Sequence, residues 1–354
     1  MPVLEELRAQ LYVSVKAACL AKAKAKQVSN DRPELPLPTE ATIEEFSRWI
    51  STSAAPVANA RLAVNMGPFA PGASRLVGAP DMPDNLDWPH HRGRALAFLA
   101  QINLASLPPG VDWPAPRRGW LYLFLGANPD GVDVGDVDAS PNRTLYFGGD
   151  VSELRIRRPP DGTTTPPEFK NAVPYSVSFE LGLSVPMGMG GVATTPWERF
   201  PNLGALNLGS LLLVTKPAVV YECKDRMFGL PRHDQIYNSQ FQAAATTAGY
   251  GSVMHLATMT VEEYGQRAAM AKQLPSPDFT KLFEEMKTRQ AALEDEAQYW
   301  CSLFSLGSHL HQGAGKGDRT WHFIWWDAQT CRILIDKRKS RSGEFSQTFI
   351  CVTD

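Results

Sequence analysis

The chain has 354 residues, of which 44% are hydrophobic, so it can bury a sizeable core in one large domain or two closely joined ones. With 35 Lys and Arg against 37 Asp and Glu, the formal net charge of -2 excludes a strongly basic protein that binds nucleic acid by phosphate neutralisation. Five cysteines without a C-x-x-C pair indicate neither a disulfide framework nor a zinc ribbon. No apolar stretch fits a signal peptide or a membrane span, so we expect a cytoplasmic protein without a membrane partner.

Two helices are predicted near the N-terminus. Residues 3–25 place leucines at three- and four-residue steps, which is typical of one helical face. After a proline-rich linker, Thr42 and Glu45 predict a capping box, in which each side chain accepts a free backbone N–H of the first turn. An apolar stripe from Phe46 to Ile50 follows and completes the second, shorter helix.

The pattern then changes to short apolar segments separated by Gly, Pro, Asn and Asp, from about residue 57 to residue 223. Such a pattern indicates many short and mostly antiparallel strands. The best candidates for strands are residues 96–104, 119–126, 144–147, 152–157, 175–181 and 211–222.

The last third of the chain returns to helices before it ends in strands. Thr260 and Glu263 form a second capping box, and Ser276 followed by Pro277 opens a long helix that runs to Tyr299. The closing strands are predicted at residues 300–307, 320–326, 331–336 and 345–352. Because helices and strands are segregated along the chain, the fold class is α+β.

Two segments of the chain repeat each other. The sequence RLVGAP at residues 75–80 recurs as RMFGLP at residues 226–231, with Arg, Gly and Pro in register. Each copy is followed by an apolar strand and then by a Trp-containing strand, FLAQINL and RRGWLYLFL in one, LFSLGSH and DRTWHFIWW in the other. The order predicts a duplicated unit, with the helical stretch at about residues 260–299 inserted into the second copy.

The stretch GAPDMPDNLDWPHHRGRALAFLAQINL at residues 78–104, followed by RRGWLYLFL, resembles the YwqG-like family, a bacterial family of unknown function. The resemblance is specific over about residues 75–126 and weaker over about residues 226–235. It implies an α+β fold of two intertwined, mostly antiparallel halves in one large domain, and no established activity.

This sequence departs from the family pattern at three places. Similar proteins have Gln and Asp where this chain has Ser305 and Gly307, and Val77 stands where a glycine is expected before Gly78. For the organisation as a whole we expect an N-terminal helical segment, a first β-rich repeat, and a second repeat that contains the helical insertion. Their predicted ranges are residues 1–56, 57–222 and 223–354.

The predicted strand at residues 96–104 carries two amide side chains inside an apolar run. Because side chains alternate between the faces of a strand, Gln101 and Asn103 share one face with Leu99, while Phe98 and the other even-numbered residues lie on the opposite face. A buried amide group without a partner costs about 1–3 kcal/mol, so these two side chains must meet backbone groups, water or a ligand.

Two interpretations of the amides stay open. In the first, they clamp the proline-rich loop at residues 79–91 onto the sheet. In the second, they line a polar recognition pocket between the repeats, in which an arginine holds an anionic group with two parallel hydrogen bonds. The candidate residues for a ligand or partner are Arg75, Asp87, Trp88, His90, Gln101, Asn103, Arg226 and Gln235. The structural alternative is that Arg75 and Arg226 only tie loops to neighbouring carbonyl groups.

Other chemistry finds less support in the sequence. His309, His311 and His322 could form a three-imidazole zinc site, with exposed loop histidines as the alternative. No catalytic set of residues is complete, so we predict neither a metal nor a cofactor, and an enzyme is the less favoured class.

We therefore expect a non-catalytic bacterial protein that acts by binding another protein. Proteins similar to this one are suspected to be immunity factors, so the resemblance implies an immunity-type protein that occludes a toxin. The alternative is an enzyme or a small-ligand sensor with a polar site in the cleft between the repeats. The sequence leaves the oligomeric state open.

Overall fold

A computed structural model describes most of the chain. The described residues are 2–29, 36–111, 113, 116–126, 142–163, 166, 169, 171–185, 199–200, 202–203, 225–228, 239–253, 259–270, 277–312, 319–323, 325 and 330–353. Within these ranges, no helix combines the length and the apolar character that a membrane crossing requires. The predicted strand at residues 211–222 lies outside the described residues.

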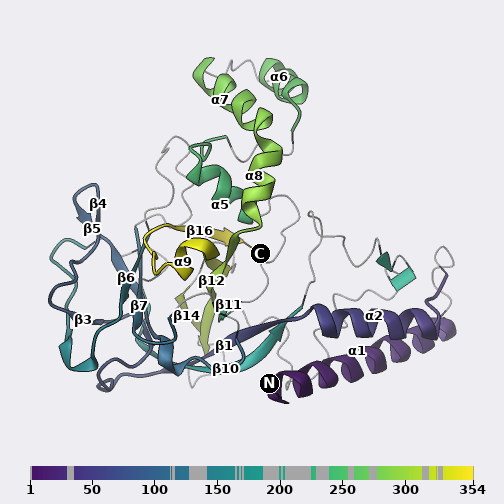
Figure 1. Ribbon diagram of the computed structural model, residues 1–354, viewed down its shortest axis with the longest axis horizontal. Helices are drawn as coiled ribbons and strands as arrows, with labels where there is room; N and C mark the ends of the chain where they lie inside the picture. The colour runs from purple at the N-terminus through teal and green to yellow at the C-terminus, as the bar shows by residue number, and fades with distance from the viewer. Residues whose placement is uncertain are drawn as a thin grey trace.

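A ten-stranded sheet of described strands forms the body of the molecule, and all of its neighbouring strands run antiparallel (Figure 1). The strands in spatial order are β16 (Thr348–Thr353), β15 (Thr330–Asp336), β12 (Trp300–Gly307), β11 (Arg226–Phe228), β1 (Ala55–Val64), β10 (Tyr175–Ser184), β2 (Arg75–Leu76), β6 (Ala97–Asn103), β7 (Trp120–Leu125) and β8 (Asn142–Phe147).

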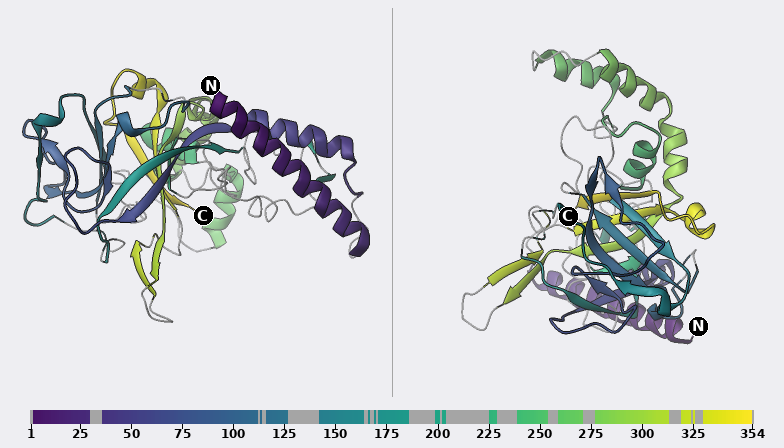
Figure 2. Two further views of the ribbon diagram at one scale, coloured as in Figure 1. Left: turned by 90° about the horizontal axis from the view of Figure 1, so that it is seen from below. Right: turned by 90° about the vertical axis from the view of Figure 1, so that its left-hand side faces the viewer.

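Smaller elements surround this sheet. Three two-stranded sheets pair β3 (Asp81–Pro83) with β9 (Leu154–Ile156), β4 (His90–His91) with β5 (Arg94–Ala95), and β13 (His309–Gln312) with β14 (Arg319–Phe323). The described helices are α1 (Pro2–Ser29), α2 (Glu40–Ser53), α5 (Ser239–Thr247), α6 (Val261–Met270), α7 (Pro277–Thr288), α8 (Gln290–Ala297), α9 (Lys337–Arg341) and the short η1 (Leu104–Ser106) and η2 (Val151–Glu153). Figure 2 shows the β13–β14 hairpin extending away from the large sheet.

The order of strands confirms the predicted α+β fold of two intertwined units. The first repeat contributes β1, β2, β6, β7 and β8 in chain order, and the second contributes β10, β11, β12, β15 and β16. The large sheet is symmetric about the pair β1–β10, so each strand of one repeat has a counterpart at the same place in the other. However, β1 pairs with β11 and β10 pairs with β2, so the repeats exchange their first strands. β10 is counted with the second repeat here by its place in the sheet, although the predicted range of the first repeat, residues 57–222, includes it; the residue boundaries of the three predicted domains stay predictions.

Backbone contacts follow the same symmetry. Arg75 lies opposite Gln101 in the first repeat, and Arg226 lies opposite Ser305 in the second. A matching backbone hydrogen bond joins each central strand to the residue just before the arginine of the other repeat: Ala60 N of β1 donates to Asp225 O at 2.9 Å, and Val177 N of β10 donates to Ser74 O at 3.1 Å. The two copies of the repeated RLVGAP-type segment therefore start from equivalent positions.

A β-bulge in β6 places some side chains on the face opposite to the predicted one. The register between β6 and β7 shifts between Phe98 and Ala100, so one extra residue turns the side chain of Phe98 to the face that Gln101 occupies. Phe98 packs with Tyr122, while Leu99 packs on the other face, in the central core. The prediction that Leu99 shares a face with Gln101 was wrong for this reason.

The second repeat has a bulge at the equivalent place. The register between β12 and β15 shifts between Ser302 and Phe304, which are the counterparts of Phe98 and Ala100. Bulges re-aim side chains and are retained as features of a fold. Their recurrence in both copies means that the two repeats share a detailed geometry as well as a strand order.

The helices confirm some of the predicted boundaries and correct others. Thr260 and Glu263 form the expected capping box, with both reciprocal bonds present at 3.1 and 2.8 Å. The first capping box was wrong, because α2 begins three residues earlier and Thr39 is its N-cap, accepting from Thr42 N at 3.2 Å. The predicted long helix from Pro277 is two helices, interrupted at Arg289, where φ -97° and ψ 5° leave the helical region.

The large sheet separates a central core from two outer layers. The central core is the buried cluster around Leu123, Phe304 and Ile333, and both repeats contribute side chains to it. On the outer face of the first repeat, Trp88 and neighbouring aromatic residues pack under the β3–β9 and β4–β5 sheets. On the outer face of the second repeat, α5 and α8 cover β15 and β16 through contacts that include Leu334. Two different coverings thus lie on equivalent faces.

The two edges of the large sheet meet. Thr348 Oγ1 of β16 lies 2.5 Å from Asn142 Oδ1 and 3.3 Å from Thr144 Oγ1, both on β8. The rings of Tyr146 and Phe345 lie 5.2 Å apart at the same junction. Because the edge strands contact each other, the sheet curls around the central core instead of ending in two open edges.

Candidate functional site

Arg75 of β2 lies buried, with 3% of its surface exposed, and its guanidinium is bonded within the protein. Nη2 forms an ion pair with Asp81 Oδ2, and Nη1 donates to Ala79 O at 3.0 Å. The guanidinium carbon also lies 4.4 Å from the centre of the Phe69 ring, within the range of a cation–π contact. Burial lowers the pKa of Arg75 and the carboxylate of Asp81 opposes this shift, so the charge is held by its partner.

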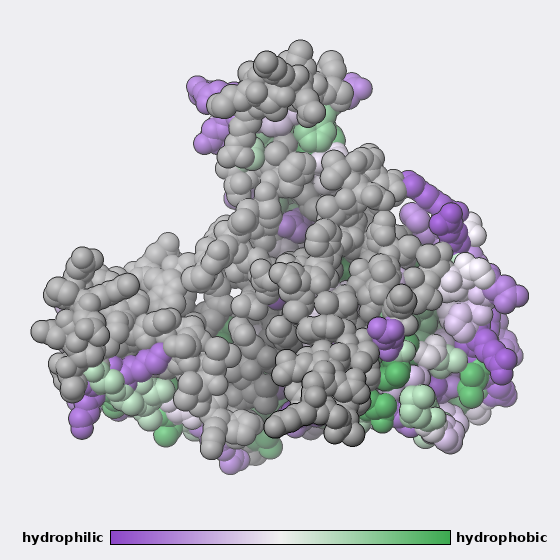
Figure 3. Space-filling view, turned by 180° about the vertical axis from the view of Figure 1, so that it is seen from behind, coloured by the Kyte–Doolittle hydropathy of each residue, from purple (hydrophilic) through white to green (hydrophobic). Residues whose placement is uncertain are grey.

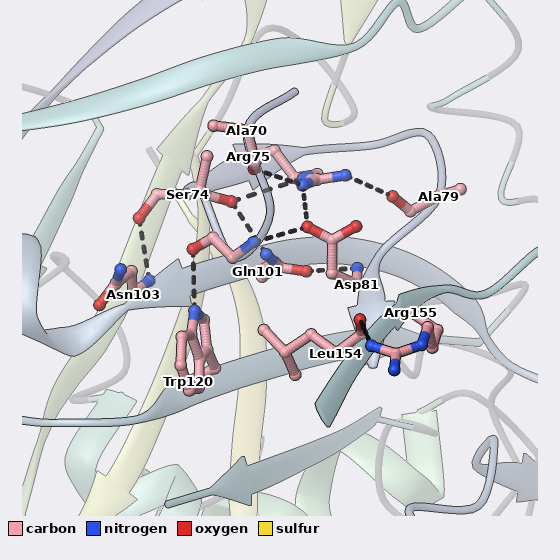
Figure 4. Close-up of polar contacts among 12 residues, drawn as sticks. Ala70, Ser74, Arg75, Ala79, Asp81, Gln101, Asn103, Trp120, Leu154 and Arg155 are labelled. Carbon is pink, nitrogen blue, oxygen red and sulfur yellow. Dashed lines mark hydrogen bonds and ion pairs between the residues drawn. The ribbon is translucent and has the colours of Figure 1, made fainter. Parts of the chain in front are cut away.

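Asp81 is the centre of this polar network (Figure 4). Its carboxylate Oδ2 also accepts from Gly72 N at 2.8 Å, and its backbone N–H donates to Gln101 Oε1 at 2.6 Å. Its backbone carbonyl accepts from Tyr122 Oη at 2.8 Å. Burial, together with the nearby carboxylate, raises the pKa of Tyr122, so this phenol stays protonated as a donor. Side chains from three neighbouring strands therefore converge on one residue of the covering loop.

The hydrogen bonds of Gln101 fit the clamp interpretation, and those of Asn103 do not. Gln101 Oε1 bonds to Asp81 and Gln101 Nε2 donates to Ala73 O at 2.9 Å, so one buried side chain holds two separate parts of the loop region. Asn103 acts locally instead, since its Oδ1 accepts from Ala105 N at 3.0 Å and caps η1. The Asn103 backbone N–H donates to Ser74 Oγ at 2.9 Å.

The structure gathers only part of the predicted polar pocket. Arg75 and Gln101 share one network, and Trp88 packs nearby, with its ring 5.1 Å from that of Phe124 and its Nε1 donating to Leu96 O. Asp87 and His90 are exposed. The side chain of Arg226 and the whole of Gln235 lie outside the described residues. The hydrogen bonds of Arg75 are those of an arginine that ties a loop to the sheet.

Val77 occupies a backbone conformation that favours glycine. Its φ is 57° and that of Gly78 is 84°, both in the left-handed region that side chains with a branched Cβ rarely adopt. Its backbone N–H donates to Leu99 O at 2.8 Å, which anchors the turn to β6. The glycine expected from the family pattern at this position is explained by this conformation.

A continuous row of paired residues crosses each repeat on its outer face. In the first repeat the row, hereafter the first outer row, is Ser176, Arg75, Gln101, Tyr122 and Leu145. In the second repeat the equivalent row, hereafter the second outer row, is Asn59, Arg226, Ser305, Arg332 and Cys351. Residues directly opposite each other in an antiparallel sheet share a face.

The second outer row carries buried polar residues that sequence reasoning missed. Asn59 is 1% exposed and Arg332 is 5% exposed. Neither atom of the Asn59 amide, Nδ2 or Oδ1, has a hydrogen-bond partner. No motif could have found these residues, because their proximity comes from the exchange of first strands, which brings β1 next to β11.

A histidine and a carboxylate meet close to the junction of the repeats. His309 Nε2 lies 2.8 Å from Asp225 Oδ2, and the same carboxylate accepts from Gly307 N at 2.8 Å. Burial and the charge of Asp225 raise the pKa of the neighbouring Tyr175. Among the residues whose placement is described, no group of three or more potential metal ligands occurs. The side chains of His311 and His322 lie outside them, so the structure does not test whether these three histidines could bind zinc.

The comparison with known families covers most of the duplicated unit and leaves out β1. A family model described as Domain of unknown function (DUF1963) matches residues 74–353, which include the described strands from β2 to β16. The match begins immediately before Arg75 and ends in the last strand of the sheet. No curated protein matches the chain.

Proposed function

The chain belongs to the family described as Domain of unknown function (DUF1963), and from this premise we propose that it is a non-catalytic bacterial factor that binds another protein. The polar network of the first repeat supports this proposal, because Arg75, Asp81 and Gln101 all bond to groups within the protein. Side chains used in this way hold a rigid scaffold. If the first repeat binds a partner, it therefore does so through exposed residues and not through this buried network.

The observation that carries the proposal is an exposed isoleucine on an edge strand. Ile156 of β9 is 70% exposed, and β9 pairs only with β3 among the strands that the structure describes. A free strand edge with an exposed apolar side chain is a ready surface for another chain. Figure 3 shows hydrophobic residues among hydrophilic ones at the end of the molecule that carries the first repeat.

The charges beside Ile156 define the kind of partner that fits. Arg155 and Arg158 are exposed on either side of it. A partner segment that offers an apolar side chain to Ile156 and carboxylates to the two arginines would be complementary in both respects. The most specific form of the proposal is an immunity-type protein that occludes an acidic surface of a toxin, which the resemblance to YwqG-like proteins supports.

The proposal can be tested by capturing proteins from a bacterial lysate on the immobilised wild-type protein and on two variants of it. Immobilised wild-type protein should retain a specific protein that Ile156→Asp loses, because the new carboxylate repels an acidic partner and removes the apolar contact. Val13→Asp on α1 is the matched control, since Val13 is 62% exposed and far from β9 in sequence and fold. It should retain the same protein as the wild type.

The identified partner should then form a stable complex with purified wild-type protein in size-exclusion chromatography, and not with Ile156→Asp. The proposal is contradicted if no protein distinguishes the two baits, or if Ile156→Asp forms the purified complex as well as the wild type does.

A second candidate, a small-ligand sensor with a polar site between the repeats, is favoured by a different observation. Asn59 lies on β1, beside the symmetric centre of the sheet, and its buried amide has no partner.

A further inference from the structure

The α1–α2 helix pair projects from one end of the large sheet (Figure 1). One face of α1 packs on α2 through a buried cluster to which α1 contributes Leu11, Val15 and Cys19. Both helices precede residue 74, where the family match begins, so the pair lies outside the segment that this chain shares with the family model. The surface that α1 presents is therefore a feature of this chain and not of the matched unit.

The outward face of α1 is apolar at its middle. Val13 is 62% exposed, and Ala9, Ala17 and Ala21 are exposed on the same side of the helix. The exposed residues of α2 are mostly charged or polar instead. They are Glu40, Ala41, Glu45, Arg48, Thr52 and Ser53. Because a helix with apolar residues on two faces is typically covered on both, the middle of α1 indicates a surface that a further helix covers.

The residues along this face follow the spacing of a coiled-coil seam. Steps of four and three residues alternate, which keeps one line of side chains directed at a partner helix. This line, hereafter the outward seam, consists of Glu6, Gln10, Val13, Ala17, Leu20 and Lys24. All six residues are exposed or half-buried in the single chain. The helix α1 therefore carries one seam that packs on α2 and a second seam that solvent reaches.

The outward seam is complementary to a reversed copy of itself. When two copies of α1 pack antiparallel with a two-fold axis level with Val15, residues at equal distances before and after Val15 lie opposite each other. Val13 of each copy then lies opposite Ala17 of the other, and Glu6 opposite Lys24. A two-fold interface requires this reciprocity, and opposite charges meet at each end of the apolar middle. A parallel pair would instead set Glu6 against Glu6 and Lys24 against Lys24.

We propose that the outward seam of α1 is the interface of a homodimer, in which α1 of a second copy of this chain packs antiparallel against it. The alanine side chains let the two helices approach closely, and Val13 fills the space between them. The two α1–α2 pairs then form a four-helix arrangement, in which each α1 has one face on α2 and the other on its partner. The inference is independent of protein binding at β9, which is on the first repeat.

Sedimentation velocity of the full chain tests the proposal. Between about 1 and 100 μM, the wild type should shift from monomer toward dimer as the concentration rises. Val13→Asp places a carboxylate in the apolar middle of both helices and should weaken association at least about tenfold. Val261→Asp is the matched control, because it makes the same change at a residue of α6 that is 42% exposed. It should associate as the wild type does.

Reversals of charge test the antiparallel arrangement. Glu6→Lys and Lys24→Glu should each weaken association, because each sets like charges against each other at both ends of the interface. The double variant that combines the two reversals restores the opposite-charge pairs with their signs exchanged, and should recover the association of the wild type. In a parallel dimer these residues meet their own copies, so no reversal would change the sign of a pair.

The proposal is overturned if the wild type stays monomeric throughout this range of concentrations, or if Val13→Asp associates as strongly as Val261→Asp. It is also overturned if the double charge reversal fails to recover what the single reversals lose. Ile156→Asp should dimerise as the wild type does, and Val13→Asp should still capture the protein that binds at β9. Failure of the dimer and failure of protein binding at β9 are therefore distinguishable.

Discussion

The two repeats of this protein use the same strands, register and bulges, and differ in how the outer face of the sheet is completed. In the first repeat, a loop returns over the outer row, and its residue Asp81 makes four hydrogen bonds. One of these four, with Arg75, is also an ion pair. In the second, helices α5 and α8 cover the outer face, and the row beneath contains Asn59 without partners. One copy is closed by its own polar groups, and the other retains unmet hydrogen-bonding capacity.

The comparison teaches how a duplication can separate stability from binding. A row that is satisfied within the protein contributes to a fixed native structure. Once one copy holds the sheet and its covering loop in place, the equivalent row of the other copy can carry groups that reduce stability but bind a ligand. The following predictions test each side of this contrast, in order of decreasing effect.

The largest effect is expected at the buried ion pair of the first repeat. Asp81→Asn leaves the charge of Arg75 buried without a counter-charge, and breaking such a pair by removing one partner costs about 3–5 kcal/mol of the free energy of unfolding. Urea denaturation measures the loss. Glu180→Gln is the matched control, because its partner Arg61 is 57% exposed and exposed pairs contribute about 1 kcal/mol or less. Equal losses of the free energy of unfolding in the two variants would contradict the claim that the polar groups of the first outer row are paired within the protein.

Converting the first row toward the second should give the next largest effect. Gln101→Ser introduces the residue that β12 has at this place, and leaves the Asp81 N–H and the Ala73 carbonyl without partners. Unmet buried groups of this kind cost about 1–3 kcal/mol. The control is Ser305→Ala in the second repeat, which should change the free energy of unfolding by less than about 1 kcal/mol. A larger loss at Ser305 than at Gln101 would reverse the contrast.

An acid-sensitive contact distinguishes the second repeat at the end of β15. Asp336, where the first repeat has Gly126, accepts hydrogen bonds from Arg338 through both its backbone N–H, at 2.8 Å, and its guanidinium. Burial on its own would raise the pKa of Asp336, but these bonds prevail and lower it. A lowered folded-state pKa means that the stabilisation is present above the unfolded pKa, about 3.9, and is lost as the pH falls through the folded value.

Urea titrations between pH 6 and pH 3 should therefore show a loss that Asp336→Asn lacks. The expected size is about 1 kcal/mol or less, because Arg338 is 45% exposed and solvent screens the pair. If the wild type and Asp336→Asn lose stability in parallel over this range, the contact does not stabilise the fold.

The smallest effect concerns reactivity. Cys301 of β12 stands where the first repeat has Ala97, and burial raises the pKa of its thiol to about 11. Since the thiolate is the reactive form, alkylation of Cys301 by iodoacetamide at pH 8 should be about 100-fold slower in the native protein than in urea. Mass spectrometry of the labelled peptides measures both rates. Fast native labelling would show that the first residues of β12 open to solvent.

Much of the fold could be predicted from the sequence because the repeat is visible in the sequence itself. Arg, Gly and Pro at equivalent places in the two RLVGAP-type segments predicted a duplication, and the register of Arg75 and Arg226 confirms it. The clamp role of Gln101 also followed from elementary reasoning, since a buried amide must find partners. The bulge at Leu99 did not, because an extra residue in one strand leaves the apolar pattern unchanged while it reverses the faces.

The candidate site was largely beyond sequence reasoning for a topological reason. Asn59 belongs to β1, whose alanine-rich sequence gives a weak strand signal, and it meets the second repeat only through the exchange of first strands. Asp81 follows the repeated segment immediately, and its pairing with Arg75 could have been inferred from that proximity. Arg332 has no such signal, since its counterpart Tyr122 is chemically different.

The most direct test of the contrast between the repeats is the free energy of unfolding of Asn59→Leu beside that of Gln101→Leu, measured in urea without added anions. If the first row is closed and the second retains an unmet amide, Gln101→Leu loses about 1–3 kcal/mol while Asn59→Leu gains stability. A loss in Asn59→Leu as large as that in Gln101→Leu would contradict the account, because it would mean that the Asn59 amide is satisfied within the protein.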